Sequence, residues 1–315
     1  MSIGAVVVSH NSAEDLPACL EALRSAVDLE RVMVVDNQSQ DGSREVVQGF
    51  ADPRIWLVVE EVNIGFAGGC NRGYREISGD FEYLAFLNPD VVVSPDCLKR
   101  STEFLATDSG LAGVAPLLMR SEGDTVDSIG QVLRPWTLEV SDRGYGKPTT
   151  TEVLKPQEVL AACGALAVFR SQALESVADA HGPWAQHFFC FWEDLELGWR
   201  LVNSGWRIES CPRAVASHRR GAGAATGSGP LRWRRPPELE ACVISNRWMT
   251  LIRHLHPLDL LTRLPLLLLW DSGLVAAGAA RRPSLLGHLR RRWPMVMREW
   301  RGRSRGRRRR LRELP

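Results

Sequence analysis

The chain has 315 residues, 44% hydrophobic and 24% charged, a balance typical of a soluble globular protein with one large or two modest domains. Its seven cysteines are scattered without a C-x-x-C pair, which argues against a disulfide framework or a zinc knuckle and for a reducing compartment. The net charge of +2 conceals an asymmetry, because residues 281–315 hold fourteen Arg and two Glu, about +12, and the rest therefore carries about −10. This distribution predicts that the basic tail meets a polyanion such as anionic lipid or nucleic acid.

Strand and helix signals alternate over the first third of the chain. Apolar runs and helical spacing predict, in chain order, a strand at 3–9, a helix at 12–26, a strand from 31 that runs into a polar turn, a helix at 43–50, a strand at 55–60, a helix at 65–78, a strand at 82–88 and a helix at 95–107. Strands that are apolar throughout and separated by helices are typical of a parallel sheet covered on both faces. The sequence therefore predicts an α/β fold with a mainly parallel, Rossmann-like central sheet.

The remaining chain is less regular. Residues 110–170 contain short apolar pieces around a loop with Gly and Pro, which predicts a mixed region with antiparallel pairing. Residues 188–212 begin with aromatic side chains, continue with three carboxylates and become an amphipathic helix that we expect to stop at Gly205. The segment GAGAATGSGP, residues 221–230, is typical of a flexible linker or lid.

Polar side chains stand where three predicted strands end. They are Ser9-His10-Asn11, Asp36-Asn37 and Asn88-Pro89-Asp90. In open parallel sheets, ligands bind beyond the carboxyl ends of the strands. Loops between strands and helices are often polar, but three with Asp or Asn at the boundary favour a binding site.

Asp90 and Asp36 each allow a functional and a structural interpretation. Pro89 ends the ladder of hydrogen bonds and holds Asp90 in a turn, where a carboxylate suits Mg²⁺ or Mn²⁺ with phosphate and water as further ligands. An ordinary Asn-Pro-Asp turn explains the same residues. Asp36 closes a buried strand, where it can accept a hydrogen bond from a ribose or base, or else form an Asx-turn or cap the next helix.

A glycine-rich segment and an acidic pair are the other candidates. NIGFAGGCNRG, residues 63–73, puts glycines before and within a helix start, where backbone N–H groups approach a phosphate or base closely. Glu193 and Asp194 follow an aromatic run; they either complement a helix dipole or supply a general base, whose pKa burial raises and the helix start lowers. Since two charges are costly to bury together, we expect one to face the site and the other a partner such as Arg200. His218 ends a further strand and gains functional interest only if it converges with Asp90.

Taken together, seven segments in order resemble the family 2 glycosyltransferases, especially the bacterial rhamnosyltransferase-like members that act on lipid- or polysaccharide-linked acceptors. The segments are VVVSHNS, VVDNQSQDGS, NIGFAGGCNRG, FLNPDVVV, ACGALAVFR, FWEDLELGWRLVNSGWRI and SHRRGAG, which cover roughly residues 3–223. The resemblance implies a GT-A fold, a nucleotide-sugar donor, a divalent metal and inversion at the anomeric carbon.

The resemblance also implies roles for individual residues. Asp90 lies in the triplet that occupies the family's DxD position and would bind Mg²⁺ or Mn²⁺, and His218 matches a histidine that in some members reaches the metal or the diphosphate. The general base would be Asp194, with Glu193 as the alternate. Asp36 would bind the base or ribose of the donor. The donor pocket would comprise His10, Asn11, Asp36, Asn63, Gly65, Asn71, Arg72 and Asn88.

Two positions depart from the family pattern, and they keep other functions open. Asn88 replaces the first Asp of DxD and so removes a charge. Cys70 stands where many members have Arg, with Arg72 nearby, which leaves the donor base open. A catalytically inactive GT-A scaffold that binds nucleotide or partners is the main alternative; Asn88 favours it, and the intact Asp90 and acidic pair oppose it. A nucleotidyltransferase usually carries a Gly-rich loop after the first strand, where this chain has SHNSAEDL.

We place a domain boundary near residue 235, between a GT-A glycosyltransferase domain at 1–235 and a C-terminal part at 236–315. The C-terminal part interleaves Leu, Trp and Met with Arg, which is typical of amphipathic helices in a membrane interface. A helical bundle packed on the first domain is the second alternative, and nucleic-acid binding the third. The longest apolar stretch, 264–280, is short for a membrane span and contains Asp271, which argues against one.

The expected location follows from these points. The N-terminus lacks the basic start of a signal peptide. We therefore expect a cytoplasmic enzyme, peripheral on the inner face of the cell membrane, that builds a cell-envelope glycan from dTDP-rhamnose or a UDP-hexose.

Overall fold

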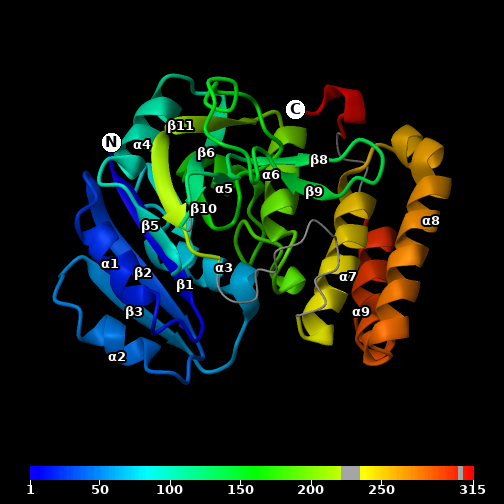
Figure 1. Cartoon of the computed structure of the whole chain (residues 1–315), viewed down its shortest axis with the longest axis horizontal. Helices are drawn as coiled ribbons and strands as arrows, with labels where there is room; N and C mark the ends of the chain where they lie inside the picture. The colour runs from blue at the N-terminus through cyan, green and yellow to red at the C-terminus, as the bar shows by residue number, and fades with distance from the viewer. Residues whose placement is uncertain (122, 221–234, 304–307) are drawn as a thin grey trace.

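The computed structural model describes residues 1–121, 123–220, 235–303 and 308–315. The linker or lid predicted at 221–230 lies outside the described residues. The described chain forms an α/β body followed by long C-terminal helices that lie against one side of it (Figure 1).

The first third of the chain follows the predicted alternation of strands and helices. Each predicted element is found, and most boundaries fall within a few residues of the expected ones. The elements are β1 (Ile3–Ser9), α1 (Leu16–Arg24), β2 (Leu29–Asn37), α2 (Ser43–Gln48), β3 (Ile55–Glu60), α3 (Gly65–Ile77), β4 (Tyr83–Leu87), β5 (Val91–Val93) and α4 (Cys97–Ala106).

The middle of the chain contains shorter strands and the predicted amphipathic helix. That helix, α6, ends shortly before Gly205, as expected. The elements are β6 (Leu111–Arg120), β7 (Val126–Ser128), β8 (Gln131–Leu133), β9 (Val140–Asp142), β10 (Leu166–Arg170), α5 (Ser171–Val177), the 3₁₀ helix η1 (Gln186–Phe188), α6 (Glu193–Asn203) and β11 (Arg207–His218).

One large mixed sheet organises the α/β body. Among the described residues it has nine strands, in the order β3-β2-β1-β4-β10-β6-β11-β5, with β7 paired to β6. Strands β3, β2, β1 and β4 are parallel to one another, as is β6 to β11, whereas β10 pairs antiparallel with β4 and β6, β5 with β11, and β7 with β6. The predicted parallel character therefore holds for the N-terminal half, and the predicted mixed region for the rest.

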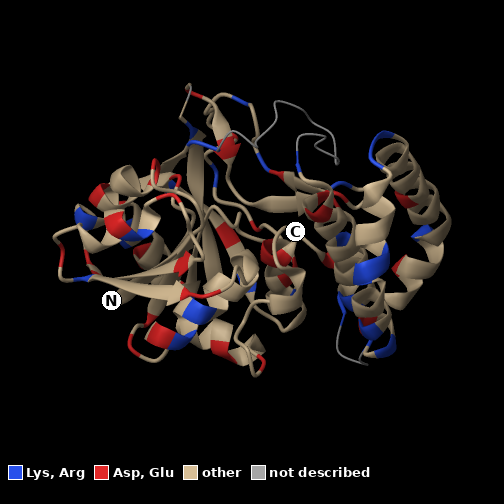
Figure 2. Ribbon diagram, turned by 90° about the horizontal axis from the view of Figure 1, so that it is seen from below, with Lys and Arg blue, Asp and Glu red and all other residues tan. Residues whose placement is uncertain are grey.

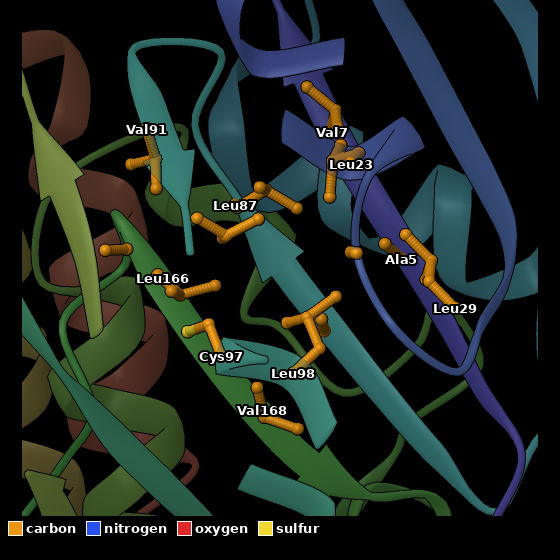
Figure 3. Packing of buried hydrophobic residues seen from close by; sticks show 14 of the residues in the cluster. Ala5, Val7, Leu23, Leu29, Leu87, Val91, Cys97, Leu98, Leu166 and Val168 are labelled. Carbon is orange, nitrogen blue, oxygen red and sulfur yellow. The ribbon is translucent and has the colours of Figure 1, made fainter. Parts of the chain in front are cut away.

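Helices cover both faces of the sheet, which explains why its strands are apolar throughout. On β1, the side chains of Ile3, Ala5 and Val7 join a core with α1, α2 and α4, and those of Val6 and Val8 join a second core with α3, α5 and α6. This alternation is the two-residue period of a strand. Figure 3 shows part of the first core.

The glycines of the glycine-rich segment are needed for the packing of α3 against β1. A Cβ atom at Gly73 would overlap the side chain of Val6, and one at Gly69 would overlap Val8. The glycines therefore let α3 lie directly on β1, which brings the start of α3 to the same edge as the end of β1.

The C-terminal helices share a core with the α/β body. They are α7 (Pro237–His254), α8 (Pro257–Arg281), α9 (Ser284–Arg301) and the 3₁₀ helix η2 (Leu311–Glu313). One cluster of buried side chains combines Leu195 and Trp199 of α6 with Met249 of α7 and Val296 of α9. The helices after residue 235 are therefore packed onto the α/β body through a shared apolar cluster.

Helix α8 is the most exposed of these helices. It presents Leu258, Leu261, Leu268 and Leu269 to solvent with 51%, 69%, 59% and 73% exposure. Among the described residues it is the one helix long and apolar enough to cross a membrane by length and composition, and 6% of its apolar window is buried. With 25 residues it is longer than the apolar stretch seen in the sequence, and Asp271 is not isolated, because Nε of Arg247 lies 2.8 Å from its Oδ1.

The arginines of the tail divide into two groups. Some bind the protein itself: Arg310 pairs with Asp259 at 2.7 Å, and Nε of Arg308 donates to the carbonyl of Arg253 at 2.8 Å. Figure 2 shows Lys and Arg distributed along the C-terminal helices. The exposed arginines among the described residues of this part include Arg290, Arg291, Arg298, Arg301 and Arg312.

Candidate active site at the carboxyl edge of the sheet

The three polar strand ends meet at one edge of the sheet. Strand β1 lies between β2 and β4 and is parallel to both, with Ser9 opposite Asp36 in the register. His10 extends this contact, since its Nδ1 lies 2.8 Å from the carbonyl oxygen of Asn37. The predicted convergence of these strand ends is therefore confirmed.

Asp36 forms the predicted Asx-turn and keeps one carboxylate oxygen available. Its Oδ2 accepts hydrogen bonds from the backbone N–H of Ser39 at 3.1 Å, an Asx-turn, and from Nε of Arg44 at 2.6 Å. Its Oδ1 is buried and has no hydrogen-bond partner among the described residues. Buried acceptors are normally satisfied, so this oxygen is suited to a donor group from a ligand such as a ribose hydroxyl or a base N–H.

Asn63 and Gly65 tie the end of β2 to the start of α3. The Oδ1 of Asn63 accepts from Nδ2 of Asn37 at 3.0 Å and from the N–H of Gly65 at 2.9 Å. Asn11 contacts the loop that follows β2, because its Oδ1 accepts a hydrogen bond from the N–H of Gln40 at 2.8 Å. His10, Asn11, Asn63 and Gly65 thus border the same edge as Asp36.

Asn71 and Arg72 are engaged elsewhere. Asn71 is fully buried, and its amide bonds the backbone of Trp184 through both Nδ2 (2.8 Å) and Oδ1 (2.9 Å). Arg72 is held by Glu60 at 2.8 Å and by Glu76. These contacts engage both the nitrogen and the oxygen of the Asn71 amide and place the guanidinium of Arg72 among carboxylates.

Asp90 meets His218, the convergence on which the interest of His218 depends. The Oδ1 of Asp90 lies 3.3 Å from Nε2 of His218, while Nδ1 of His218 lies 2.8 Å from Oδ2 of Asp127, whose side chain is fully buried. Burial opposes a charge on the imidazole, but the hydrogen bonds with Asp127 and Asp90 outweigh it and raise the pKa of His218 to about 9. Asn88 belongs to the same turn, with its N–H donating to the carbonyl of Ala165 at 3.0 Å.

A chain of charges continues from Asp127 into the middle of the site. Arg220 contacts Oδ1 of Asp127 at 2.5 Å and Oδ2 of Asp142 at 3.0 Å. The pKa of Asp127 is lowered overall: burial raises it, but the hydrogen bond with His218 and the charge of Arg220 lower it further. Asp127, Asp142 and Arg220 were not identified from the sequence as site residues, because short strands and loops give no sign that these three charges meet.

The pair Asp90 and His218 fits a divalent metal that also binds phosphate. A carboxylate behind the second nitrogen of a ligating histidine orients the ring, and Asp127 holds Nδ1 in this way and leaves Nε2 facing Asp90. No group of three or more His, Cys, Asp or Glu able to hold a metal occurs in the described part of the chain. Mg²⁺ and Mn²⁺ are commonly held by one or two protein ligands with phosphate and water completing the shell, so two ligands suffice if a diphosphate is present.

Asp194 is the acid of the pair that borders the site. Its Oδ2 accepts from Nε2 of Gln131 at 2.7 Å and from the N–H of Gly164 at 2.9 Å, and its side chain is partly exposed. Burial raises the pKa of Asp194, although these hydrogen bonds oppose the shift, and the charge of Asp142 raises it further. Asp194 is therefore a carboxylate with a raised pKa that feels the charge of Asp142, the last residue of the chain of charges that begins at Asp90.

Glu193 faces the interior. It is 6% exposed, and its Oε2 has no hydrogen-bond partner among the described residues. Burial first and the charge of Asp194 second raise the pKa of Glu193 well above its usual value. The expectation that the second acid contacts Arg200 is wrong, because Arg200 pairs with Glu196 at 2.9 Å, one helical turn away.

Comparison with known proteins identifies the sequence family. The sequence profile described as "Glycosyl transferase family 2" matches residues 5–178. The chain is 34% identical over 100 residues to the succinoglycan biosynthesis protein ExoO of Rhizobium meliloti, covering 31% of this chain and 28% of that protein. It is 25% identical over 250 residues to an N-acetylglucosaminyl-diphospho-decaprenol L-rhamnosyltransferase of Mycobacterium tuberculosis, covering 71% of this chain and 78% of that protein.

Solved structures share the fold at low sequence identity. A mannosyltransferase of Pyrobaculum calidifontis, PcManGT, in complex with GDP-Man and Mn²⁺, aligns with a TM-score of 0.54 and 19% identity over 96% of this chain and 83% of its own. GalNAc-T7 with UDP, GalNAc and Mn²⁺ aligns with a TM-score of 0.62 and 12% identity over 82% of this chain and 48% of its own. The chain thus spans about half of GalNAc-T7 and about a quarter of ExoO.

Proposed function

The chain belongs to glycosyl transferase family 2 and has the GT-A fold, and from that premise we propose that it is an inverting, metal-dependent glycosyltransferase. In this proposal it moves a sugar from a nucleotide-sugar donor to a lipid- or polysaccharide-linked acceptor in the synthesis of a cell-envelope glycan. The donor is dTDP-rhamnose or a UDP-hexose. Two relatives support this acceptor class, since one is named for succinoglycan biosynthesis and the other for rhamnosyl transfer to a lipid-linked diphosphate sugar.

One observation supports the proposal: a candidate metal-binding pair lies near a separate carboxylate, because Gly164 donates to that carboxylate and the next residue, Ala165, accepts a hydrogen bond from the turn that contains Asp90. Asp90 and His218 form the pair, and Asp194 is the separate carboxylate. An inverting transfer needs a base for the proton of the acceptor hydroxyl and a positive centre for the leaving diphosphate. A bound Mg²⁺ or Mn²⁺ would neutralise negative charge on that diphosphate, and the solved relatives PcManGT and GalNAc-T7 were obtained with Mn²⁺.

In this proposal, Asp36 and Asp194 have separate roles. Asp36 offers its unpartnered Oδ1 to the base or ribose of the donor. Asp194 takes the proton from the acceptor hydroxyl as that oxygen attacks the anomeric carbon and the bond to the diphosphate breaks. Its raised pKa strengthens it as a base, while the hydrogen bonds from Gln131 and Gly164 fix its orientation.

The C-terminal helices hold the enzyme on the inner face of the cell membrane in this proposal. Helix α8 exposes several leucines, and α9 exposes Trp293 and Trp300 together with several arginines. Apolar side chains flanked by Arg are suited to the headgroup region of an anionic bilayer. A peripheral enzyme in this position meets a lipid-linked acceptor without leaving the membrane surface.

Thermal-shift titration tests the proposal directly. The purified chain is heated with UDP, GDP, dTDP and their sugar conjugates, each with Mg²⁺, with Mn²⁺ or with EDTA. We expect stabilisation by one family of nucleotides that depends on the metal, followed by slow metal-dependent hydrolysis of the matching nucleotide-sugar without acceptor. Metal-dependent binding without any hydrolysis or transfer would instead identify an inactive scaffold, and no binding of any nucleotide would overturn the proposal.

A further inference from the structure

The segment that leads into the acidic pair has a strained backbone. Phe189, Phe191 and Trp192 have positive φ angles of 67°, 68° and 71°. Bulky residues rarely adopt this conformation, and each instance costs on the order of 1–3 kcal/mol unless surrounding contacts hold it. Three instances immediately before Glu193 and Asp194 mean that the position of these acids depends on what holds the segment 188–192.

The segment is held on one side by the glycine-rich start of α3. The N–H of Ala67 donates to the carbonyl of Phe189 at 3.1 Å. A Cβ atom at Gly65 would overlap that same carbonyl. The start of α3 is therefore in backbone contact with the segment that leads into the acidic pair.

On the other side, Asn246 of α7 holds the segment. Asn246 is fully buried, and its Nδ2 lies 2.9, 2.9 and 2.7 Å from the carbonyl oxygens of Phe188, Cys190 and Phe191. These carbonyls lie outside any long helix or strand, so the amide supplies donors that regular structure would otherwise provide. An NH₂ group has two hydrogens, so the three carbonyls share them.

Arg292 of α9 fixes the orientation of that amide. Its Nη2 donates to Oδ1 of Asn246 at 2.6 Å, and its Nε donates to Oγ of Ser245 at 2.6 Å. Arginine has donors only, so the oxygen of Asn246 must face Arg292 and the NH₂ must face the segment. Helices α7 and α9 pack on each other alongside α6 (Figure 1), which makes this arrangement part of the shared core.

We propose that Asn246, oriented by Arg292, is a positioning residue that holds Asp194 in place through the strained segment 188–192. The inference rests on the proposed function, in which Asp194 takes the acceptor proton. It gives the C-terminal helices a second role beyond membrane contact, because the placement of the base depends on two of them.

Two variants and one control test this proposal in the full chain. Asn246→Ala removes the donors, and Arg292→Met frees the amide to rotate while changing a partly exposed residue. Thr250→Val is the matched control, since Thr250 is fully buried on the same helix and its hydroxyl has no hydrogen-bond partner among the described residues. Each protein is measured for Tm, donor affinity, kcat, KM for the acceptor and hydrogen exchange of the amides of residues 186–196.

A displaced base changes catalysis more than binding. We expect kcat to fall by about 100-fold in Asn246→Ala and about tenfold in Arg292→Met, with donor affinity within about twofold of wild type, because small misplacements of reacting groups have effects of this size. Hydrogen exchange of amides 188–194 should accelerate in both variants. Thr250→Val should change neither kcat nor the exchange rate. If Asn246→Ala does not fold, Arg292→Met carries the same comparison.

Two outcomes separate failure of this proposal from failure of the proposed function. Wild-type kcat and exchange in Arg292→Met and Asn246→Ala, in a chain that transfers sugar, would overturn the positioning role alone. If the wild-type chain transfers no sugar, the proposed function fails, and the exchange measurement still decides whether Asn246 holds the segment. If a variant has a lower Tm and loses kcat and donor affinity by the same factor, Asn246 has only a general structural role. That result would also overturn the proposal.

Discussion

Nε2 of His218 lies 3.3 Å from Oδ1 of Asp90, and the register of the sheet explains this proximity. Strand β11 runs antiparallel to β5, with His218 directly opposite Val91, the residue that follows Asp90. The backbone N–H of Arg219 also donates to the carbonyl of Asp90 at 3.0 Å. The contact between the two side chains is thus fixed by backbone pairing.

Replacing Asp127 by Asn should weaken metal binding without removing a metal ligand. Asp127 holds Nδ1 of His218, and loss of such an outer carboxylate typically weakens metal affinity by about 10–100-fold. The measurement is calorimetric titration of Mn²⁺ in the presence of the nucleoside diphosphate. Asp108→Asn is the control, because it removes the acid of another Asp–Arg pair, with Arg207, next to the opposite end of β6. Equal Mn²⁺ affinity in both variants would contradict the role of Asp127.

The identity of the base is tested by comparing Asp194→Asn with Glu193→Gln. Asp194 is partly exposed and bonded to Gln131 and Gly164, whereas Glu193 faces the interior. We expect Asp194→Asn to keep donor affinity and to lower the transfer rate by about 10²–10⁴-fold, the usual contribution of a general base. Turnover close to wild type in Asp194→Asn, with a large loss in Glu193→Gln, would assign the base to Glu193 instead.

The buried Glu193 should make stability depend on pH. Because burial raises the pKa of Glu193 in the folded state, the folded chain holds this proton more tightly than the unfolded chain. Its contribution to stability is fully present below the unfolded pKa and is lost as pH rises through the folded pKa. Denaturant unfolding at a series of pH values should show Glu193→Gln gaining stability over wild type as pH increases. Glu103 is an exposed residue on α4 and serves as the control. An equal gain in Glu103→Gln would show that the pH dependence of stability does not come from Glu193.

The parts of the site that sequence reveals are those carried by local pattern. Apolar strands with polar ends give the edge of the sheet and Asp36 and Asp90 within it, since neighbouring parallel strands end together. Asp127 gives no such signal, because β7 has three residues and its position depends on long-range pairing with β6. Asn246 is invisible for the same reason, since its partners are backbone carbonyls far away in the chain.

Residues that are neighbours in a motif can have different surroundings. The family resemblance implies a place for Asn71 in the donor pocket, whereas in the structure its amide bonds the backbone of Trp184 and its side chain is buried. A helix places successive side chains about 100° apart, so neighbours in a motif need not face the same ligand. Glycines 69 and 73 likewise are required by the close approach of α3 to β1.

Substitution of Gly65 by Ala should destabilise the fold far more than the same substitution at a glycine that also has a positive φ but lies in open space. Gly65 has φ +76° and no room for a Cβ against Phe189, whereas Gly79 has φ +90° with nothing within 4 Å. We expect Gly79→Ala to lower the free energy of unfolding by about 1 kcal/mol from backbone strain alone, and Gly65→Ala to lower it by about 3 kcal/mol. Denaturant unfolding of both variants measures the difference, and equal losses would mean that the contact with Phe189 is not constraining.

The exposed leucines of α8 should determine binding to anionic membranes. Leu268 and Leu269 are 59% and 73% exposed, and transfer of a leucine side chain into an apolar environment contributes about 1.5 kcal/mol or more. We expect Leu268→Asp and Leu269→Asp each to reduce co-sedimentation with anionic liposomes about tenfold while leaving Tm unchanged. Val62→Asp is the control, since Val62 is an equally exposed apolar residue on the α/β body.

The arginines of α9 separate the electrostatic part of that binding from the apolar part. Arg290→Gln with Arg291→Gln removes two exposed charges that we expect to contribute about 1 kcal/mol each near an anionic surface, and the loss should vanish at high salt. The leucine variants should lose binding at every salt concentration, because apolar transfer is not screened. Equal partitioning of wild type, the leucine variants and the arginine variant would show that α8 and α9 do not meet the bilayer, and would leave a protein partner as the occupant of this surface.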